Sequence, residues 1–402
     1  MGFKYIRINY SQDEFEGVYN ISPCGLLTET GISPWKPETG NWDELPVVFA
    51  NDNPMVPFDI FSAIFYLVTR YEEYLPFKPD QYGRFQAEES VAFKNGFLRL
   101  PIVELWCRKL AEVLKIECLC CNLSESHYRF RLTIDIDHPW LFKNKGWFYA
   151  AGSLLRELAR FNISQFRERL SVLTGRENDP GDTYNFLATL QPKINEVISY
   201  FVLCRKSGGY DNNRSVKRKA LHRLVKWLDI NGKVGIHPSF VSNTNDSILD
   251  KEIAYLSKIL ERDILFSRQH YLCLSFPDTY YHLILSGINE DYSMGYSSQT
   301  GFRAGIARSF NFFDLQNNRE TELRIYPFQI MDRTLLSYMK LSPDEAEKEF
   351  EYYYDITRNV GGEFICLWHN DSLSDWGEWK GWKKVFEKMV NLNSKHDPVP
   401  EK

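Results

Sequence analysis

The stretch of sequence that decides the fold reads Leu132-Thr133-Ile134-Asp135-Ile136-Asp137-His138-Pro139. From Tyr128 to Ile134, apolar and polar side chains alternate, which predicts a β-strand with one apolar face. Because strand side chains alternate between two faces, we expect Asp135 and Asp137 to lie on the same face. Pro139 cannot continue a central ladder, so the strand is predicted to end before it.

These two aspartates make the end of the strand a candidate site. Two carboxylates so close together repel each other unless a metal ion or a shared proton relieves the repulsion. The alternative is a solvated strand end, in which Arg129 and Arg131 on the same face offset the two acids.

The composition is that of a globular protein. The 402 residues suffice for one large domain or two ordinary ones, and 15% of them are aromatic. That aromatic share suits either a sugar-binding cleft or a large aromatic core. The net charge of −5 gives no basic excess for nucleic acid, and no run of Lys or Arg marks a membrane surface.

The N-terminus has no apolar leader segment, so we expect a cytoplasmic protein with reduced thiols. The apolar run at 61–68 is too short to span a bilayer, so stable membrane insertion is not expected. Cys118, Cys120 and Cys121 could bind a metal, although they fit better as an apolar strand of small thiols. The sequence does not define an oligomeric state.

Strand and helix patterns alternate from about residue 128 to residue 390. Strands are predicted at 198–204, 233–238, 264–271, 288–292, 322–326 and 363–368. Such alternation indicates an α/β protein with a parallel sheet or a (β/α) barrel. We therefore predict a smaller N-terminal α/β domain at 1–125 and a barrel at 126–402, with a helical insertion near 141–195.

Polar residues fall at or just after the ends of these strands, namely Asp135, Asp137, His237, His270 and His369. In (β/α) barrels that end of the sheet holds the active site. Each histidine taken singly is more often structural than a ligand. One aspartate with two histidines would supply three ligands to a divalent metal ion and leave one coordination position open. Zinc is the expected ion. Such a site suits hydrolysis of an amide or an ester.

Thr133-Ile134-Asp135-Ile136-Asp137 resembles the Asp-x-Asp variant of the first motif of the polysaccharide deacetylase family, also called NodB-homology or carbohydrate esterase family 4. The resemblance implies a distorted (β/α) barrel that removes acetyl groups from acetylated sugars with a divalent metal. It also implies that Asp135 is the catalytic base and Asp137 a metal ligand.

The second family motif has two histidines, of which this chain keeps His237 and has Val241 in place of the other. His270 is the expected replacement ligand, and His138 is a further candidate. Leu367-Trp368-His369 resembles the fifth motif, which implies that His369 is the general acid.

Three further residues are predicted to bind substrate. Arg268 could fill the third, arginine-containing motif, and Asp332 could orient His369. Arg303 lies in a segment, 291–305, that resembles bacterial members with an extra N-terminal domain, where it either binds substrate or braces a loop.

The sequence therefore predicts a metal-dependent deacetylase that acts on a carbohydrate substrate. One alternative is a catalytically degenerate barrel that binds a glycan or a protein partner, because Val241 removes a ligand. Another is a glycosyltransferase that uses Asp135 and Asp137 on the metal of a nucleotide sugar.

Overall fold

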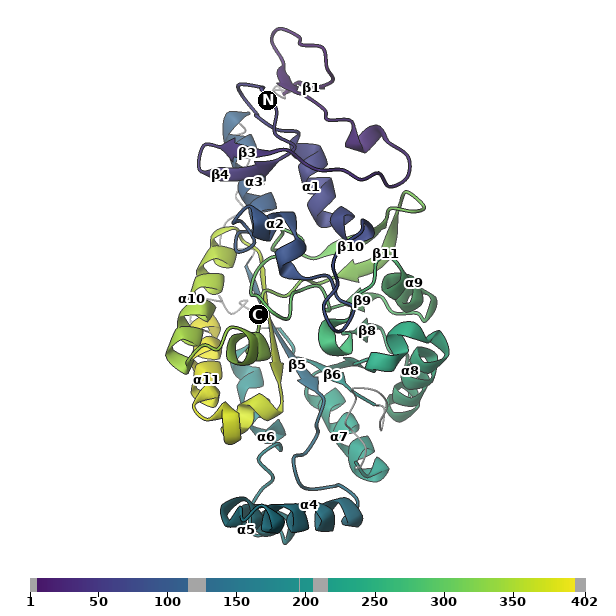
Figure 1. Ribbon diagram of the computed structural model, residues 1–402, viewed down its shortest axis with the longest axis vertical. Helices are drawn as coiled ribbons and strands as arrows, with labels where there is room; N and C mark the ends of the chain where they lie inside the picture. Colours follow the sequence, from purple (N-terminus) through teal and green to yellow (C-terminus); the bar gives the residue numbers. More distant parts are fainter. Residues whose placement is uncertain (1–5, 115–127, 195, 205–215, 395–402) are drawn as a thin grey trace.

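The computed structural model of the protein describes residues 6–114, 128–194, 196–204 and 216–394. At its centre is a curled sheet of nine strands in the order β10-β11-β9-β8-β7-β6-β5-β13-β12 (Figure 1). The strands are β5 (Arg129–Ile136), β6 (Ser199–Val202), β7 (Lys233–Ile236), β8 (Phe266–Ser267), β9 (Glu290–Asp291), β10 (Phe310–Asp314), β11 (Arg319–Ile325), β12 (Ile330–Met331) and β13 (Glu363–His369).

All neighbouring strands of this sheet are parallel except β10 and β11, which are antiparallel. The two edge strands, β10 and β12, do not pair with each other within the described ranges. The protein is therefore a mixed α/β structure whose sheet is curled but open at its edges.

Strand β5 forms as its alternation predicts. The side chains of Leu132, Ile134 and Ile136 belong to the main hydrophobic core on the helix-covered side of the sheet. Asp135 lies on the opposite face and lines a pocket. Strand β13 pairs with β5 so that His369 lies directly opposite Asp135. A late strand thus places its terminal histidine beside the first aspartate.

The strand predicted at 264–271 is mostly wrong, since β8 has only two residues. After Ser267 the chain leaves the ladder: the N–H of Gln269 donates to Ser293 Oγ (2.8 Å) and that of His270 donates to the carbonyl of Pro238 (3.2 Å). Tyr271 then adopts a left-handed conformation, with φ of 61°, which ends any extended run. His270 therefore lies in a short turn beyond the strand.

Helices cover the outer face of the sheet, and the main core lies between the two layers. The helices after β5 are α4 (Trp147–Ala159), α5 (Ile163–Leu173), α6 (Tyr184–Leu190), α7 (Arg218–Asn231), α8 (Asp246–Leu260), α9 (Asp278–Leu285), α10 (Pro343–Asn359) and α11 (Trp382–Ser394). Helix α10 begins at a capping box between Ser342 and Glu345. Among the described residues, no helix has the length and apolar character that crossing a membrane requires.

Residues 6–114 form two small sheets and most of a second hydrophobic core, to which Tyr296 and Leu315 also contribute. The elements of this N-terminal part are β1 (Ile8–Tyr10), β2 (Tyr19–Ile21), β3 (Thr39–Trp42), β4 (Leu45–Val48), α1 (Ile60–Val68), α2 (Val91–Lys94) and α3 (Ile102–Val113). Asp59 caps α1 by accepting a hydrogen bond from the N–H of Ser62 (3.1 Å). The predicted boundary at residue 125 and the cluster of Cys118, Cys120 and Cys121 lie outside the described residues.

A buried network of charges connects this N-terminal part to the rest of the protein. Glu73 accepts hydrogen bonds from Arg70 Nε (2.7 Å) and from Arg303 Nε (2.9 Å) and Arg303 NH2 (2.5 Å). Arg70 also donates to Glu72 and to the hydroxyl of Tyr296. Burial alone would raise the pKa of Glu73, but the two guanidinium groups lower its pKa overall.

Glu73→Gln should therefore destabilise the protein, because it leaves two buried guanidinium groups facing a neutral amide. We expect a loss of about 3 kcal/mol in the free energy of unfolding, measured by urea denaturation. Glu261→Gln is the matched control, since Glu261 forms an exposed pair with Lys226 (3.1 Å) and should cost less than about 1 kcal/mol. Equal effects of the two substitutions would show that the network does not stabilise the fold.

Candidate metal centre and active-site pocket

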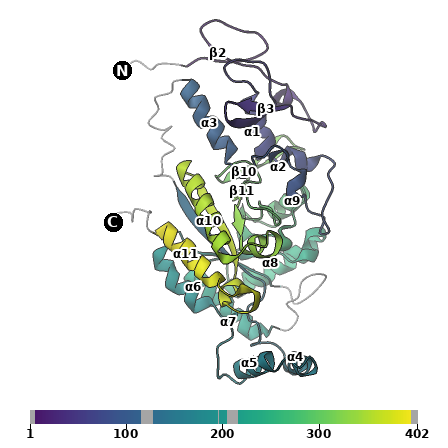
Figure 2. The same cartoon turned by 60° about the vertical axis from the view of Figure 1, so that its left-hand side comes forward.

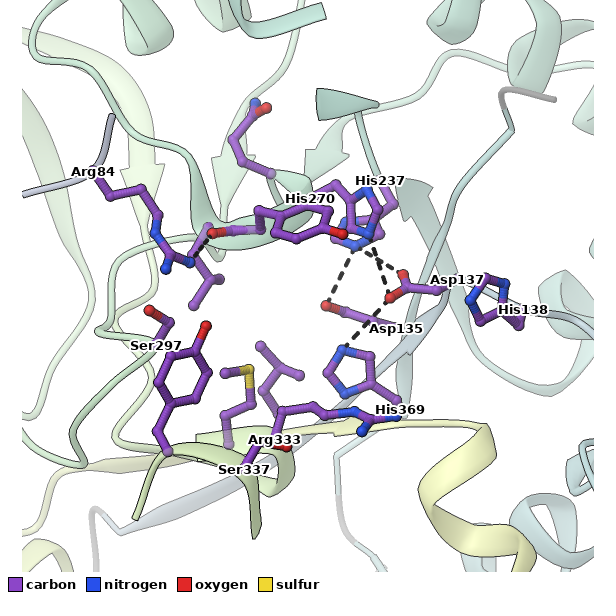
Figure 3. A pocket seen from close by; sticks show the side chains of 16 residues that line it. Arg84, Asp135, Asp137, His138, His237, His270, Ser297, Arg333, Ser337 and His369 are labelled. Atoms are coloured by element: carbon purple, nitrogen blue, oxygen red, sulfur yellow. Dashed lines mark hydrogen bonds and ion pairs between the residues drawn. The ribbon is translucent and has the colours of Figure 1, made fainter. Parts of the chain in front are cut away.

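A pocket of about 370 Å³ opens at the carboxyl ends of the central strands (Figure 3). It is lined by Arg84, Asp135, Asp137, His138, His237, Gln269, His270, Tyr271, Leu272, Ser297, Met331, Arg333, Ser337, Tyr338, Leu367 and His369. The five polar residues predicted at strand ends are all among them. The parallel arrangement explains this convergence, because the carboxyl ends of parallel strands meet at one edge of the sheet.

Three of these side chains form a cluster suited to a metal ion. One ligand atom each from Asp137, His237 and His270 can be chosen so that all lie within 4.8 Å of one another. His237 Nε2 is 3.1 Å from Asp137 Oδ1, and His270 Nε2 is 3.5 Å from Asp137 Oδ2. One carboxylate and two imidazoles are a donor set that fits Zn²⁺ with a coordination position left open.

The hydrogen bonds around His237 fix which ring nitrogen faces the cluster. Its Nδ1 lies against the main-chain carbonyl of Arg268, which can only accept a hydrogen bond. Nδ1 must therefore carry a proton, so Nε2, which lies 3.1 Å from Asp137 Oδ1, is the ring nitrogen available to a metal ion. A main-chain carbonyl that orients a histidine in this way is typical of metal ligands.

The electrostatics of Asp137 also fit a metal ligand. Burial alone would raise the pKa of this carboxyl, but the imidazoles of His270 and His237 lower its pKa well below the usual value. Asp137 is therefore ionised at neutral pH, as a ligand must be.

Asp135 lies beside the cluster and in front of a buried arginine. Asp135 Oδ2 is 3.6 Å from His237 Nε2, and Asp135 Oδ1 is 3.6 Å from Arg268 NH1. The guanidinium of Arg268 is completely buried between the rings of Phe201 (4.9 Å) and Phe328 (5.4 Å), and its burial lowers its pKa. One oxygen of Asp135 thus lies within ion-pair distance of Arg268, and the carboxylate lines the pocket.

His369 approaches the cluster from the opposite side (Figure 3). Its Nε2 is 3.7 Å from Asp137 Oδ2, whereas its Nδ1 lies 2.8 Å from Asp332 Oδ1. The main-chain N–H of His369 donates to the other oxygen of Asp332 (2.8 Å). Burial lowers the pKa of His369, but the Asp332 carboxylate outweighs this effect and raises the pKa to about 10.

Asp332→Asn should lower the pKa of His369, because the neutral amide no longer favours the imidazolium. We expect a decrease of about one to three pH units in the metal-free protein. NMR titration of the histidine ring protons measures it, and His282, which is paired with Asp246, serves as an internal control. An unchanged pKa of His369 would show that Asp332 does not set its protonation.

The same pair makes stability depend on pH with a definite sign. The pKa of His369 rises on folding from the ordinary 6.5 to about 10. The ion pair therefore stabilises the folded state fully below pH 6.5, and this contribution is lost as the pH rises through about 10. Denaturant unfolding at several pH values should show this loss in the wild type and a flatter dependence in Asp332→Asn.

The three residues predicted to bind substrate are all buried, and none lines this pocket. Arg268 lies behind Asp135, and Asp332 lies behind His369. Arg303 is engaged with Glu73 and with the carbonyl of Gly295 (2.8 Å). Of the two roles that the sequence left open for Arg303, bracing a loop matches these contacts.

The pocket is lined instead by residues that the sequence did not single out. Arg84 comes from the N-terminal part, where it pairs with Asp80 (2.7 Å) and donates to the carbonyl of Tyr271 (2.6 Å). Arg333 and Tyr338 come from the segment after β12. No local pattern marks these side chains, and only the position of Arg333 next to Asp332 could have drawn attention to one of them.

The departure from the second family motif is visible in the structure. Val241 lies in a short 3-10 helix, η7 (Phe240–Thr244), and does not line the pocket. His270 occupies the third corner of the cluster. His138, the other candidate, lines the pocket but does not belong to the three-residue cluster.

Residues 2–118 match the model of a family of unknown function, DUF7033. No curated protein matches the chain. Two solved structures show a distant likeness in fold: a protein from Mycobacterium smegmatis provisionally described as a polysaccharide deacetylase and a 4-alpha-glucanotransferase from Thermococcus litoralis.

The first of these has a TM-score of 0.44 and 12% sequence identity, over 68% of this chain and 86% of the other. The second has a TM-score of 0.40 and 10% identity, over 67% of this chain and 38% of the other. At these values neither likeness bears on the function of this protein.

Proposed function

We propose that this protein is a metal-dependent hydrolase that removes acetyl groups from an acetylated sugar or polysaccharide precursor. The observation that carries the proposal is the cluster of Asp137, His237 and His270, with Asp135 on one side and His369 on the other. The motif order along the chain supports it, because these residues follow the family pattern except at Val241.

The side chains divide the chemistry between them. A divalent ion held by Asp137, His237 and His270 would polarise the acetyl carbonyl and acidify a water molecule. Asp135 accepts the proton of the attacking water, and Arg268 lies within ion-pair distance of this carboxylate. His369 donates a proton to the departing amine or alkoxide, while Asp332 keeps its Nδ1 protonated and its Nε2 directed at the pocket.

The walls of the pocket are compatible with a sugar that carries a small acyl group. Leu272, Met331 and Leu367 supply apolar surface to the walls, and Arg84 and Arg333 supply guanidinium groups. We further propose that residues 126–402 are a distorted barrel of the NodB-homology type, that residues 1–125 are a separate domain, and that the ion is zinc.

Acetate release tests the proposal. The purified protein, loaded with zinc, is incubated with an N-acetylated chitooligosaccharide and with an O-acetylated xylan, and acetate is measured enzymatically. We expect release from at least one substrate, and its loss after chelation and recovery after zinc is returned. Tight glycan binding without acetate from either substrate would favour the non-catalytic barrel instead.

A further inference from the structure

Helices α4 and α5 form a hairpin at one end of the molecule, away from the nine-stranded sheet (Figures 1 and 2). Its outer face consists of large apolar side chains on α4 and in the turn that follows: Trp147, Phe148, Leu155, Leu158 and Phe161. The exposed fraction is 74% for Phe148, 66% for Leu155 and 89% for Phe161. We call these five residues the outer face of α4.

The polarity of this hairpin is the reverse of that of an ordinary surface helix. The residues of α4 that are buried against its surroundings include Ser153 and Glu157, and Glu157 pairs with Arg169 of α5 (3.5 Å). A surface helix normally buries its apolar stripe and exposes its polar one. An exposed face that is continuous and apolar indicates a surface covered by a partner.

The hairpin is held firmly where it joins the body of the protein. The buried carboxylate of Asp179 accepts hydrogen bonds from the N–H groups of Leu141 (2.9 Å), Phe142 (2.7 Å) and Lys143 (2.6 Å), which ties the two ends of the insertion together. The guanidinium of Arg169 also lies 4.5 Å from the centre of the Phe142 ring. The outer face of α4 is therefore presented in a fixed position.

The charge of the hairpin indicates the chemistry of the partner. Helices α4 and α5 with the turn between them (147–173) contain four Arg and two Glu, a net charge of +2, and the flanking residues Lys143, Lys145 and Arg176 raise the net charge of 141–176 to +5, in a chain whose net charge is −5. Arg156 and Arg160, one helical turn apart, are exposed at the C-terminal end of α4. Trp147 and Tyr149 at the start of α4 are residues that favour the boundary between water and lipid. A partner that is both apolar and anionic is required.

We propose that the outer face of α4 docks on the surface of an anionic phospholipid bilayer. The apolar side chains would enter the boundary between headgroups and acyl chains, while the exposed arginines at the C-terminal end of α4 would contact lipid phosphates. A partner protein would satisfy the apolar face but would not by itself explain the excess of one sign of charge around it. The proposal goes beyond the proposed hydrolysis and does not depend on it.

Co-sedimentation of the full chain with vesicles tests the docking. We expect binding to vesicles of phosphatidylcholine mixed with phosphatidylglycerol, weaker binding to phosphatidylcholine alone, and a decrease in binding as salt is added. Phe148→Ser with Leu155→Ser should lower the partition coefficient at least about tenfold. Arg156→Gln with Arg160→Gln should lower it about 25-fold, since each surface arginine contributes about fivefold.

Ile230→Ser with Leu285→Ser is the matched control. These side chains are 83% and 84% exposed and lie on α7 and at the end of α9. The control should bind vesicles like the wild type, and circular dichroism confirms that each variant is folded. Absence of wild-type binding to the anionic vesicles would overturn the proposal, as would an equal loss of binding in the control.

Sedimentation velocity without lipid separates docking on lipid from self-association. If the wild type is a dimer that Phe148→Ser with Leu155→Ser converts to a monomer, the outer face of α4 is an interface between copies and the proposal is wrong. A monomeric wild type that binds anionic vesicles supports it.

Discussion

His237→Ala should release the metal ion and abolish acetate release. His237 is the most buried of the three candidate ligands, and its Nε2 is fixed toward Asp137 by the hydrogen bond at Nδ1. Because even residues that only orient a ligand contribute about 10–100-fold to metal affinity, loss of the ligand itself should weaken zinc binding more than about 100-fold. Elemental analysis and calorimetric zinc titration measure this change.

His138→Ala is the matched control, because His138 lines the same pocket but lies outside the three-residue cluster. We expect it to retain zinc, whereas Asp137→Ala and His270→Ala should lose it as His237→Ala does. Full zinc occupancy in His237→Ala would refute the candidate metal centre. Loss of zinc in His138→Ala, with retention in His270→Ala, would reassign the third ligand.

Asp135→Asn should lower turnover about 10²–10⁴-fold, the usual contribution of one general base. The amide has the shape of the carboxylate but cannot accept the proton of water. The same variant should keep its zinc, because Asp137, His237 and His270 are unchanged. Acetate release by wild type and variant, with zinc content measured in both, provides the comparison.

If the turnover of Asp135→Asn is within a factor of about two of the wild type, the decrease is far smaller than the expected 10²–10⁴-fold. That result would refute the assignment of Asp135 as the base. Loss of zinc from this variant would instead identify Asp135 as a ligand. The two results can be told apart. In the first, zinc content and turnover both stay close to those of the wild type; in the second, both decrease.

Local patterns in the sequence predict the parts of this protein that local forces decide. Strand β5 has eight residues, which is long enough for an alternation of apolar and polar side chains to be recognised. The sequence alone therefore indicates which of its faces is apolar. The cap at Asp59 and the proline at the start of α10 are likewise local signals. The aspartates and histidines at strand ends could be grouped because parallel strands carry their carboxyl ends to one edge.

Such patterns do not predict the short strands. Strands β8, β9 and β12 have two residues each, which is too few for any period to appear. Their existence depends on neighbouring strands that are distant in the sequence. The turn that positions His270 depends in the same way on the main-chain carbonyl of Pro238 and the hydroxyl of Ser293.

By itself, the sequence indicated the candidate site residues and the approximate order of strands and helices. Only the tertiary structure decided that Arg303 is held by Glu73, that Arg84 reaches the pocket, and that Arg268 is buried. The helical pattern of α4 was likewise visible in the sequence, but not that its apolar side faces outward. The physical reason is that exposure and pairing depend on which distant segments the fold brings together, and no periodicity along the chain encodes that.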